Sequence, residues 1–186
     1  MNGIVLAGGK ATRLNGIEKG MIIHLGKPII EHLIHLLQLY VKEIIIVSNT
    51  DAYNYLKTNT IEIIPDTIKN IGPLGGIYSG LIHSNAEKNI ILACDTPFIN
   101  ASVINNLLSV SEEYDIIVSE CNEVIHPLCG IYSKKIIPVM ENMIQSGNFK
   151  VKELLKKVNI LKVHFPNEYT TFFTNINTPD DLKLMQ

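Results

Sequence analysis

The fold is decided by residues 2–13, which read NGIVLAGGKATR. Asn2–Leu6 is a short apolar run with β-branched residues, as expected for a buried strand. Gly8 and Gly9 follow directly, and two consecutive glycines let the backbone come close to a ligand and turn its N–H groups toward phosphate oxygens. This stretch therefore predicts a strand followed by a phosphate-binding loop.

Two cations follow the glycines and strengthen the prediction. Arg13 can form a bidentate contact with phosphate oxygens, and Lys19 can add a point charge. No Rossmann GxGxxG motif is present, and no Walker A loop, because Pro28 stands where that loop needs Ser or Thr. An ordinary strand-to-helix turn with solvated Lys and Arg side chains stays open as the alternative.

Short β-rich runs and helical patterns alternate along the rest of the chain. Strands are predicted at 43–48, 62–65, 89–94, 115–119 and 128–132, with a short one at 21–25. Helices are predicted at 28–41, after a loop at 72–76 as far as Ser84, at 134–146, and from an N-cap at Thr178. This alternation is typical of an α/β fold with a mainly parallel sheet, and we expect residues 1–186 to form one domain.

Composition narrows the class of protein. The net charge is -2 over 186 residues, so no bulk basic field is available to bind nucleic acid or an anionic membrane. Polar residues interrupt the most apolar helical segment, 28–41, which is too short to span a bilayer, and we see no secretory signal at the N-terminus. The three cysteines contain no CxxC pair, which favours a reducing compartment. We therefore expect a cytoplasmic protein.

Asp95 is the second candidate for function. It follows the predicted strand 89–94 and lies at its carboxyl end, the edge at which open α/β sheets bind ligands. A carboxylate there, followed by Thr96-Pro97, suits Mg²⁺ held against nucleotide phosphates. A turn or N-cap aspartate is the alternative on local sequence alone. The glycine loop favours the metal role, because a nucleotide site needs both a phosphate cradle and a metal carboxylate.

Taken in order, these motifs and others resemble the molybdenum cofactor guanylyltransferase (MobA) family over nearly the whole chain. The matching segments are Leu6-Ala7-Gly8-Gly9, Arg13, Lys19-Gly20, Gly72-Pro73-Leu74-Gly75-Gly76, Cys94-Asp95-Thr96-Pro97-Phe98, His126-Pro127-Leu128 and Asn175-Ile176-Asn177-Thr178-Pro179-Asp180-Asp181-Leu182. The resemblance implies a doubly wound, Rossmann-like nucleotidyltransferase fold. It also implies transfer of GMP from GTP to molybdopterin, with Mg²⁺ as cofactor and pyrophosphate as product.

The resemblance implies a role for each matching residue. Nucleotide contacts are expected from Leu6, Ala7, Gly8, Gly9, Lys19, Asn49, Asp66 and Asp95, with Asp95 as the metal ligand. Arg13, Lys19 and Asp95 are the expected catalytic residues, and Asn175 and Asn177 are expected to bind the acceptor. Two positions depart from the family pattern: Asn15 replaces a glycine, and Lys150 replaces a common arginine, which exchanges a forked donor for a point charge.

Two other functions stay open at this stage. A related nucleotidyltransferase that uses CTP or another NTP, or a sugar phosphate or different pterin as acceptor, would carry much the same first loop and Asp95. A nucleotide-binding regulatory protein without catalysis would have no need for a metal carboxylate, so Arg13, Lys19 and Asp95 together argue against it. The sequence does not reveal whether molybdoenzyme delivery proteins are partners.

Overall fold

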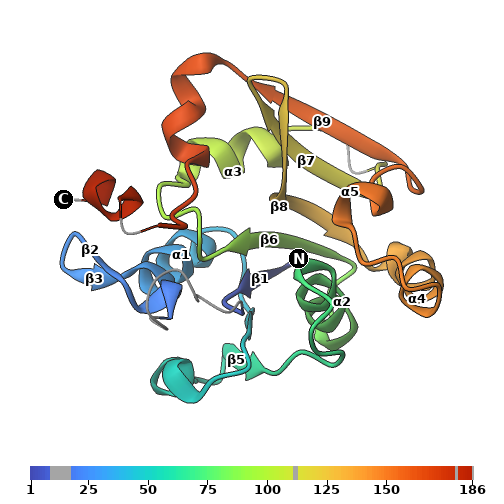
Figure 1. The fold of residues 1–186 in the computed structure, drawn as a ribbon, viewed down its shortest axis with the longest axis horizontal. Helices are drawn as coiled ribbons and strands as arrows, with labels where there is room; N and C mark the ends of the chain where they lie inside the picture. The colour runs from blue at the N-terminus through green and yellow to red at the C-terminus, as the bar shows by residue number, and fades with distance from the viewer. Residues whose placement is uncertain (9–17, 111–112, 179, 186) are drawn as a thin grey trace.

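The computed structural model describes residues 1–8, 18–110, 113–178 and 180–185. Its centre is a seven-stranded sheet with the order β5-β4-β1-β6-β8-β7-β9 (Figure 1). The strands are β1 (Asn2–Leu6), β4 (Ile44–Val47), β5 (Ile61–Ile64), β6 (Lys88–Ala93), β7 (Ile116–Cys121), β8 (Val124–Ser133) and β9 (Ile160–Phe165). Within the described sheet, β8 pairs antiparallel with β6 and β7, and the other pairings are parallel. The mainly parallel sheet predicted from the sequence is confirmed.

The central strands are buried on both faces, which explains their β-branched composition. Every residue of β1 and of β4 is buried. Side chains alternate between the two faces of a strand, so Val5 and Ile46 join one core cluster while Ile4 and Ile45 join the other. The sheet therefore separates two hydrophobic cores.

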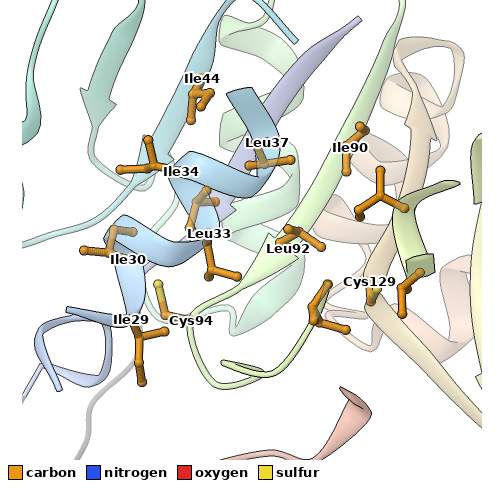
Figure 2. Packing of buried hydrophobic residues seen from close by; sticks show 14 of the residues in the cluster. Ile29, Ile30, Leu33, Ile34, Leu37, Ile44, Ile90, Leu92, Cys94 and Cys129 are labelled. Atoms are coloured by element: carbon orange, nitrogen blue, oxygen red, sulfur yellow. The ribbon is translucent and has the colours of Figure 1, made fainter. Parts of the chain in front are cut away.

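Helices cover each core. The first face is covered by α1 (Ile29–Gln38) and α3 (Ala101–Leu108), and the second by α2 (Pro73–His83), α4 (Ile137–Gln145) and the short α5 (Val151–Leu154). Figure 2 shows Leu33 and Leu37 of α1 facing Ile90 and Leu92 of β6, and all four side chains are buried. Helices on both faces make the sheet doubly wound, as the resemblance implied.

Several predicted boundaries are wrong. Pro28 is the N-cap of α1, so this helix begins at Ile29. The predicted loop at 72–76 is in fact the start of α2, which has Pro73 in its first turn. Gly75 and Gly76 therefore serve close packing instead of a turn: a Cβ on Gly76 would lie 3.1 Å from Leu6 Cδ2. Double glycine next to proline is a turn signal locally, and tertiary packing overrides it here.

Short 3₁₀ helices account for the remaining differences. Instead of one strand at 21–25, the chain forms η2 (Lys19–Met21) and a small hairpin of β2 (Ile23–His24) and β3 (Lys27–Pro28). The helix predicted at 134–146 is divided into η4 (Lys134–Ile136) and α4, and the C-terminal one is η6 (Asp181–Met185). Five elements were not predicted: η3 (Asp51–Leu56), α3, α5, β9 and η5 (Asn167–Phe173).

No helix formed by the described residues has the length and apolar character needed to cross a bilayer. The three cysteines, Cys94, Cys121 and Cys129, are buried and form no disulfide.

Candidate functional site

The site lies where four parallel strands end at the same edge of the sheet. The Cys94 N–H donates to the Leu6 carbonyl oxygen at 3.1 Å, and the Ala7 N–H donates to the Val47 carbonyl oxygen at 3.0 Å. In the sheet, β1 has β4 as its neighbour on one side and β6, which comes later in the chain, as its neighbour on the other. The segments that follow β1 and β6 therefore leave the sheet at a topological switch point, where α/β sheets bind ligands.

Gly8 follows β1 and meets the residues that follow β4 and β5. A Cβ on Gly8 would lie 3.8 Å from Asp66 Oδ2. Asn49 Nδ2 donates to the same oxygen at 2.7 Å, and the Asp66 N–H donates back to Asn49 Oδ1 at 3.1 Å. A Cβ on Gly76 would lie 3.7 Å from Asp66 Oδ1. Four residues from four different segments thus form one polar group beside the end of β1.

Asn49 also borders a hollow in the surface. The hollow has a volume of about 250 Å³ and is lined by Ser48, Asn49, Thr50, Asp51, Asn54, Ile63, Ile64, Pro65 and Lys69. Its lining comes from the end of β5 and from the segments that follow β4 and β5.

Lys19 is brought to the end of β6 by its neighbour Gly20. Gly20 is buried, and a Cβ there would lie 2.8 Å from Tyr53 Oη and 3.1 Å from Cys94 Sγ. Only a residue without a side chain can pack this closely against both groups. Lys19 is thereby fixed next to the segment that begins with Asp95.

Asp95 is a partly buried carboxylate beside this lysine. Burial raises the pKa of Asp95, and the positive charge of Lys19 opposes that rise. An incompletely solvated carboxylate favours a cation in its vicinity. Lys19 and Asp95, two of the three predicted catalytic residues, therefore lie together at the switch point.

The C-terminal segment reaches the same place from the far end of the chain (Figure 1). The Ile176 N–H donates to the backbone carbonyl oxygen of Asp95 at 2.7 Å, and Lys19 Nζ donates to Asn177 Oδ1 at 2.6 Å. Ile176 is fully buried and anchors the segment, whereas Asn175 is exposed. Of the two asparagines predicted to bind the acceptor, Asn177 thus contacts Lys19, and Asn175 directly precedes the residue that is bonded to Asp95.

The metal-ligating side chains near Asp95 indicate which kind of metal ion the site could hold. In the described part of the chain, no three His, Cys, Asp or Glu side chains form a metal cage. Mg²⁺ is commonly held by one or two carboxylates together with substrate phosphates and water, in contrast to ions that need an all-protein cage. A single carboxylate beside a lysine fits an ion that arrives with a polyphosphate.

Some predicted residues lie outside the described residues, and some important neighbours were not predicted. Gly9, Arg13 and Asn15 lie outside the described residues. The sequence analysis did not predict the packing of Tyr53 against Gly20, next to Lys19, because Tyr53 belongs to η3 and no local pattern pointed to it. The contact of the Asp181 carboxylate with the Asn177 N–H was also not predicted, because the N-cap pattern at Thr178 does not point to it.

Comparison with known proteins shows the family of the chain. The profile of the MobA-like NTP transferase domain matches residues 3–162. A probable molybdenum cofactor guanylyltransferase of Flavobacterium johnsoniae is 38% identical over 96% of this chain and 92% of its own length. The molybdenum cofactor guanylyltransferase of Vibrio parahaemolyticus is 33% identical over 96% of this chain and 91% of its own.

A solved structure has the same fold. Molybdopterin-guanine dinucleotide biosynthesis protein A of Archaeoglobus fulgidus superposes with a TM-score of 0.80 at 27% identity. The superposition covers 100% of this chain and 96% of that one. Fold, motif order and sequence identity all lead to the same family. The chain belongs to the MobA-like NTP transferase domain family and is a nucleotidyltransferase.

Proposed function

We propose that this chain is a molybdenum cofactor guanylyltransferase, which transfers GMP from GTP to molybdopterin and releases pyrophosphate. The observation that carries the proposal is the meeting of Lys19, Asp95 and Asn177 at the switch point, one strand away from Gly8. The relatives in Flavobacterium and Vibrio, which are named as molybdenum cofactor guanylyltransferases, support the choice of base and acceptor.

The chemistry requires positioning and charge neutralisation more than proton transfer. The attacking group is a phosphate oxygen of the acceptor, which is already anionic at neutral pH, so no general base is needed. Two polyanions must be brought together for an in-line displacement at the α-phosphorus. Lys19 neutralises phosphate charge, and the backbone N–H group of Gly8 orients the nucleotide beside it.

Asp95 is the proposed magnesium ligand. When bound, Mg²⁺ supplies further neutralisation of the phosphate oxygens. The partial burial of Asp95 supports this role, because an incompletely solvated carboxylate favours a cation beside it.

The remaining predicted residues take roles around this centre. Asn49 and Asp66, joined by two hydrogen bonds, are proposed to bind the nucleoside, together with Leu6. Asn175 and Asn177 are proposed to bind the acceptor. Gly9 and Arg13 keep their proposed phosphate contacts.

We place the reaction in the cytoplasm, where buried cysteines that form no disulfide stay reduced. The net charge of -2 supports small anionic substrates held by a few placed groups instead of nucleic acid or a membrane surface as partner. Molybdoenzyme delivery proteins are further candidate partners.

The test is pyrophosphate release with molybdopterin and each of GTP, ATP, CTP and UTP in the presence of Mg²⁺. We expect kcat/KM for GTP to exceed that for every other NTP by at least about tenfold, because a site that hydrogen-bonds one base rejects a base that leaves its polar groups unpaired. A preference for CTP would replace the proposed function with that of a cytidylyltransferase. Absence of pyrophosphate with all four would refute it.

Asp95→Ala tests the metal role in the same assay. We expect a loss of turnover of about a hundredfold or more with an intact fold. The matched control is Asp115→Ala, which removes a carboxylate at the amino end of β7, where it accepts only the Asn159 N–H among the described contacts. Near-normal turnover of Asp95→Ala would contradict the role of Asp95.

A further inference from the structure

Three consecutive backbone N–H groups hold the segment that carries Asn177. The Ile176 N–H donates to the Asp95 carbonyl oxygen at 2.7 Å. The Asn177 and Thr178 N–H groups both donate to Asp181 Oδ2, at 2.8 and 2.7 Å. The backbone on each side of the Asn177 side chain is therefore fixed, by the Asp95 carbonyl oxygen on one side and by the Asp181 carboxylate on the other.

Asp181 does more than cap a helix. Thr178 Oγ1 accepts from the Asp181 N–H at 3.3 Å, and the Thr178 N–H donates to the Asp181 carboxylate. This reciprocal pair is a capping box, which satisfies the start of η6. The additional hydrogen bond from the Asn177 N–H lies outside the box, one residue earlier, and is not needed to start a helix.

The extra bond orients a side chain that contacts the proposed phosphate-binding lysine. Asn177 Oδ1 accepts from Lys19 Nζ at 2.6 Å. Lys19 thereby lies among three polar groups from the middle and the end of the chain, Asp95, Asn177 and Asp181. The hydrogen bonds from Asn177 and Thr178 lower the pKa of Asp181, and the charge of Lys19 lowers it further, as expected for neighbouring opposite charges.

We propose that Asp181 is a positioning residue for the transfer reaction: by accepting the Asn177 N–H it holds the Asn177 amide oxygen against Lys19 and so fixes the direction of the lysine ammonium group. The proposal rests on the proposed function for the role of Lys19 in phosphate binding. Asp181 itself touches neither substrate.

A double-mutant cycle tests the coupling. Asp181→Ala should lower kcat/KM by about tenfold in the wild-type protein but by less than about twofold in an Asn177→Ala background, because the two residues act through one contact. The melting temperature should fall by similar amounts in both backgrounds, since loss of the capping box does not depend on Asn177. Additive effects of the two substitutions on kcat/KM would mean that Asp181 acts only as a helix cap, and this would overturn the proposal.

Two further variants separate positioning from charge. Both N–H groups reach the same carboxylate oxygen, so the carbonyl oxygen of Asp181→Asn can replace it, and we expect this variant to recover most of the activity. Asp180→Ala is the matched control: it removes an exposed neighbouring carboxylate that pairs with Lys183 and should leave kcat/KM unchanged. If Asp181→Asn were as impaired as Asp181→Ala, the carboxylate charge would be responsible and the positioning role would be wrong.

A crystal structure of Asp181→Ala tests the inference without any turnover. We expect the Asn177 side chain to leave Lys19 Nζ while the Ile176 anchor and the sheet stay in place. An unchanged contact between Lys19 and Asn177 would overturn the inference, whatever the enzyme's activity. Absence of pyrophosphate release by the wild-type protein would instead refute the proposed function, so the two failures are distinguishable.

Discussion

Gly20 lies between two buried side chains, Tyr53 and Cys94, and leaves no space there for even one methyl group. Its neighbour Lys19 extends from this fixed point to Asn177 and into the field of Asp95. At the scale of single residues, the site is therefore built by packing under the lysine as much as by the lysine itself.

Gly20→Ala should displace Lys19 without removing any charged group. The new Cβ would lie 2.8 Å from Tyr53 Oη, so the backbone must shift by a few tenths of an ångström or more. We expect kcat/KM to fall roughly tenfold to a hundredfold, as for other small misplacements of a positioning group. Tyr53→Phe in the same chain removes the nearest atom and should restore part of the activity. Unchanged kinetics of Gly20→Ala would show that the position of Lys19 is not critical.

Asp95→Asn should stabilise the metal-free protein while it abolishes turnover. Burial raises the pKa of Asp95 above the ordinary value of 3.8, so the ionised form costs folding free energy at neutral pH. An amide removes that cost, and we expect the melting temperature in a chelator to rise by a few degrees. Asp115→Asn is the control and should not change it. A lower melting temperature for Asp95→Asn would mean that the Asp95 charge is well compensated without a metal.

Among single residues, the sequence predicted those site residues that follow the end of a strand. Asp95 and Gly8 follow directly from their strands, so both could be placed at the edge of the sheet. Tyr53 could not be found, because it reaches the site from a 3₁₀ helix that has no sequence pattern of its own. Contacts between segments far apart in the chain, such as Lys19 to Asn177, are likewise invisible to local reasoning.

At the scale of secondary-structure elements, α2 shows most clearly how the site is supported. This helix packs on β1 through glycines, and a Cβ on Gly80 would lie 2.6 Å from Ile4 Cγ2. The close approach keeps the start of α2 near Leu6 and Asp66, where Gly76 lies. The geometry at the end of β1 thus depends on the short distance between α2 and β1.

Gly80→Ala should push α2 away from β1. We expect a loss of about 1–3 kcal/mol in the free energy of unfolding, the usual cost of overpacking a close-packed core. Truncation of the facing side chain in Ile4→Ala should make the double variant less destabilised than the sum of the single variants. Chemical denaturation measures both effects. A Gly80→Ala protein as stable as the wild type would show that the core can accommodate the methyl group.

The strand β8 and the 3₁₀ helix η5 are joined by a histidine whose protonation should matter for stability. The His126 ring stacks on Phe173 with a centroid distance of 4.5 Å and an interplanar angle of 21°. Burial lowers the pKa of His126 below the ordinary value of 6.5. The unfolded chain therefore binds this proton more readily than the folded one.

The sign of the pH dependence follows directly. The contribution of neutral His126 is fully present above pH 6.5 and is lost as the pH falls below that value toward the folded-state pKa. His126→Phe keeps an aromatic ring but cannot titrate, so its melting temperature should fall less between pH 7 and pH 5 than that of the wild type. Parallel pH profiles of the two proteins would contradict the prediction.

Elements with strong periodicity were predicted, and those with weak periodicity were not. The uninterrupted apolar run of β4 indicated a strand buried on both faces, and the stripe of α1 indicated a helix. In contrast, α3 has only Val103, Ile104 and Leu107 facing the core. β9 is an exception: its apolar residues alternate with Lys162 and His164, as is typical of a half-buried strand, and it was nevertheless not predicted. The antiparallel direction of β8 is set by its neighbours and is not encoded in its own residues.

At the scale of the whole molecule, one sheet edge collects the beginning, middle and end of the chain. Lys19, the Asp95 carboxylate after β6 and the segment before η6 meet there, although Lys19 and Asn177 are 158 positions apart in sequence. Parallel strand order explains the first two, because the carboxyl ends of β1 and β6 must share an edge. The arrival of the C-terminal segment depends on tertiary contacts, chiefly buried Ile176 and its hydrogen bond to Asp95.

The central claim is that Gly8, Lys19 and Asp95 act on a single triphosphate. It is tested most directly by a crystal structure of the protein with Mg²⁺ and a non-hydrolysable GTP analogue. The account predicts phosphate oxygens within hydrogen-bonding distance of Lys19 Nζ and of the backbone N–H group of Gly8, with the metal on Asp95. A triphosphate bound instead in the hollow beside Asn49, remote from Lys19 and Asp95, would contradict it.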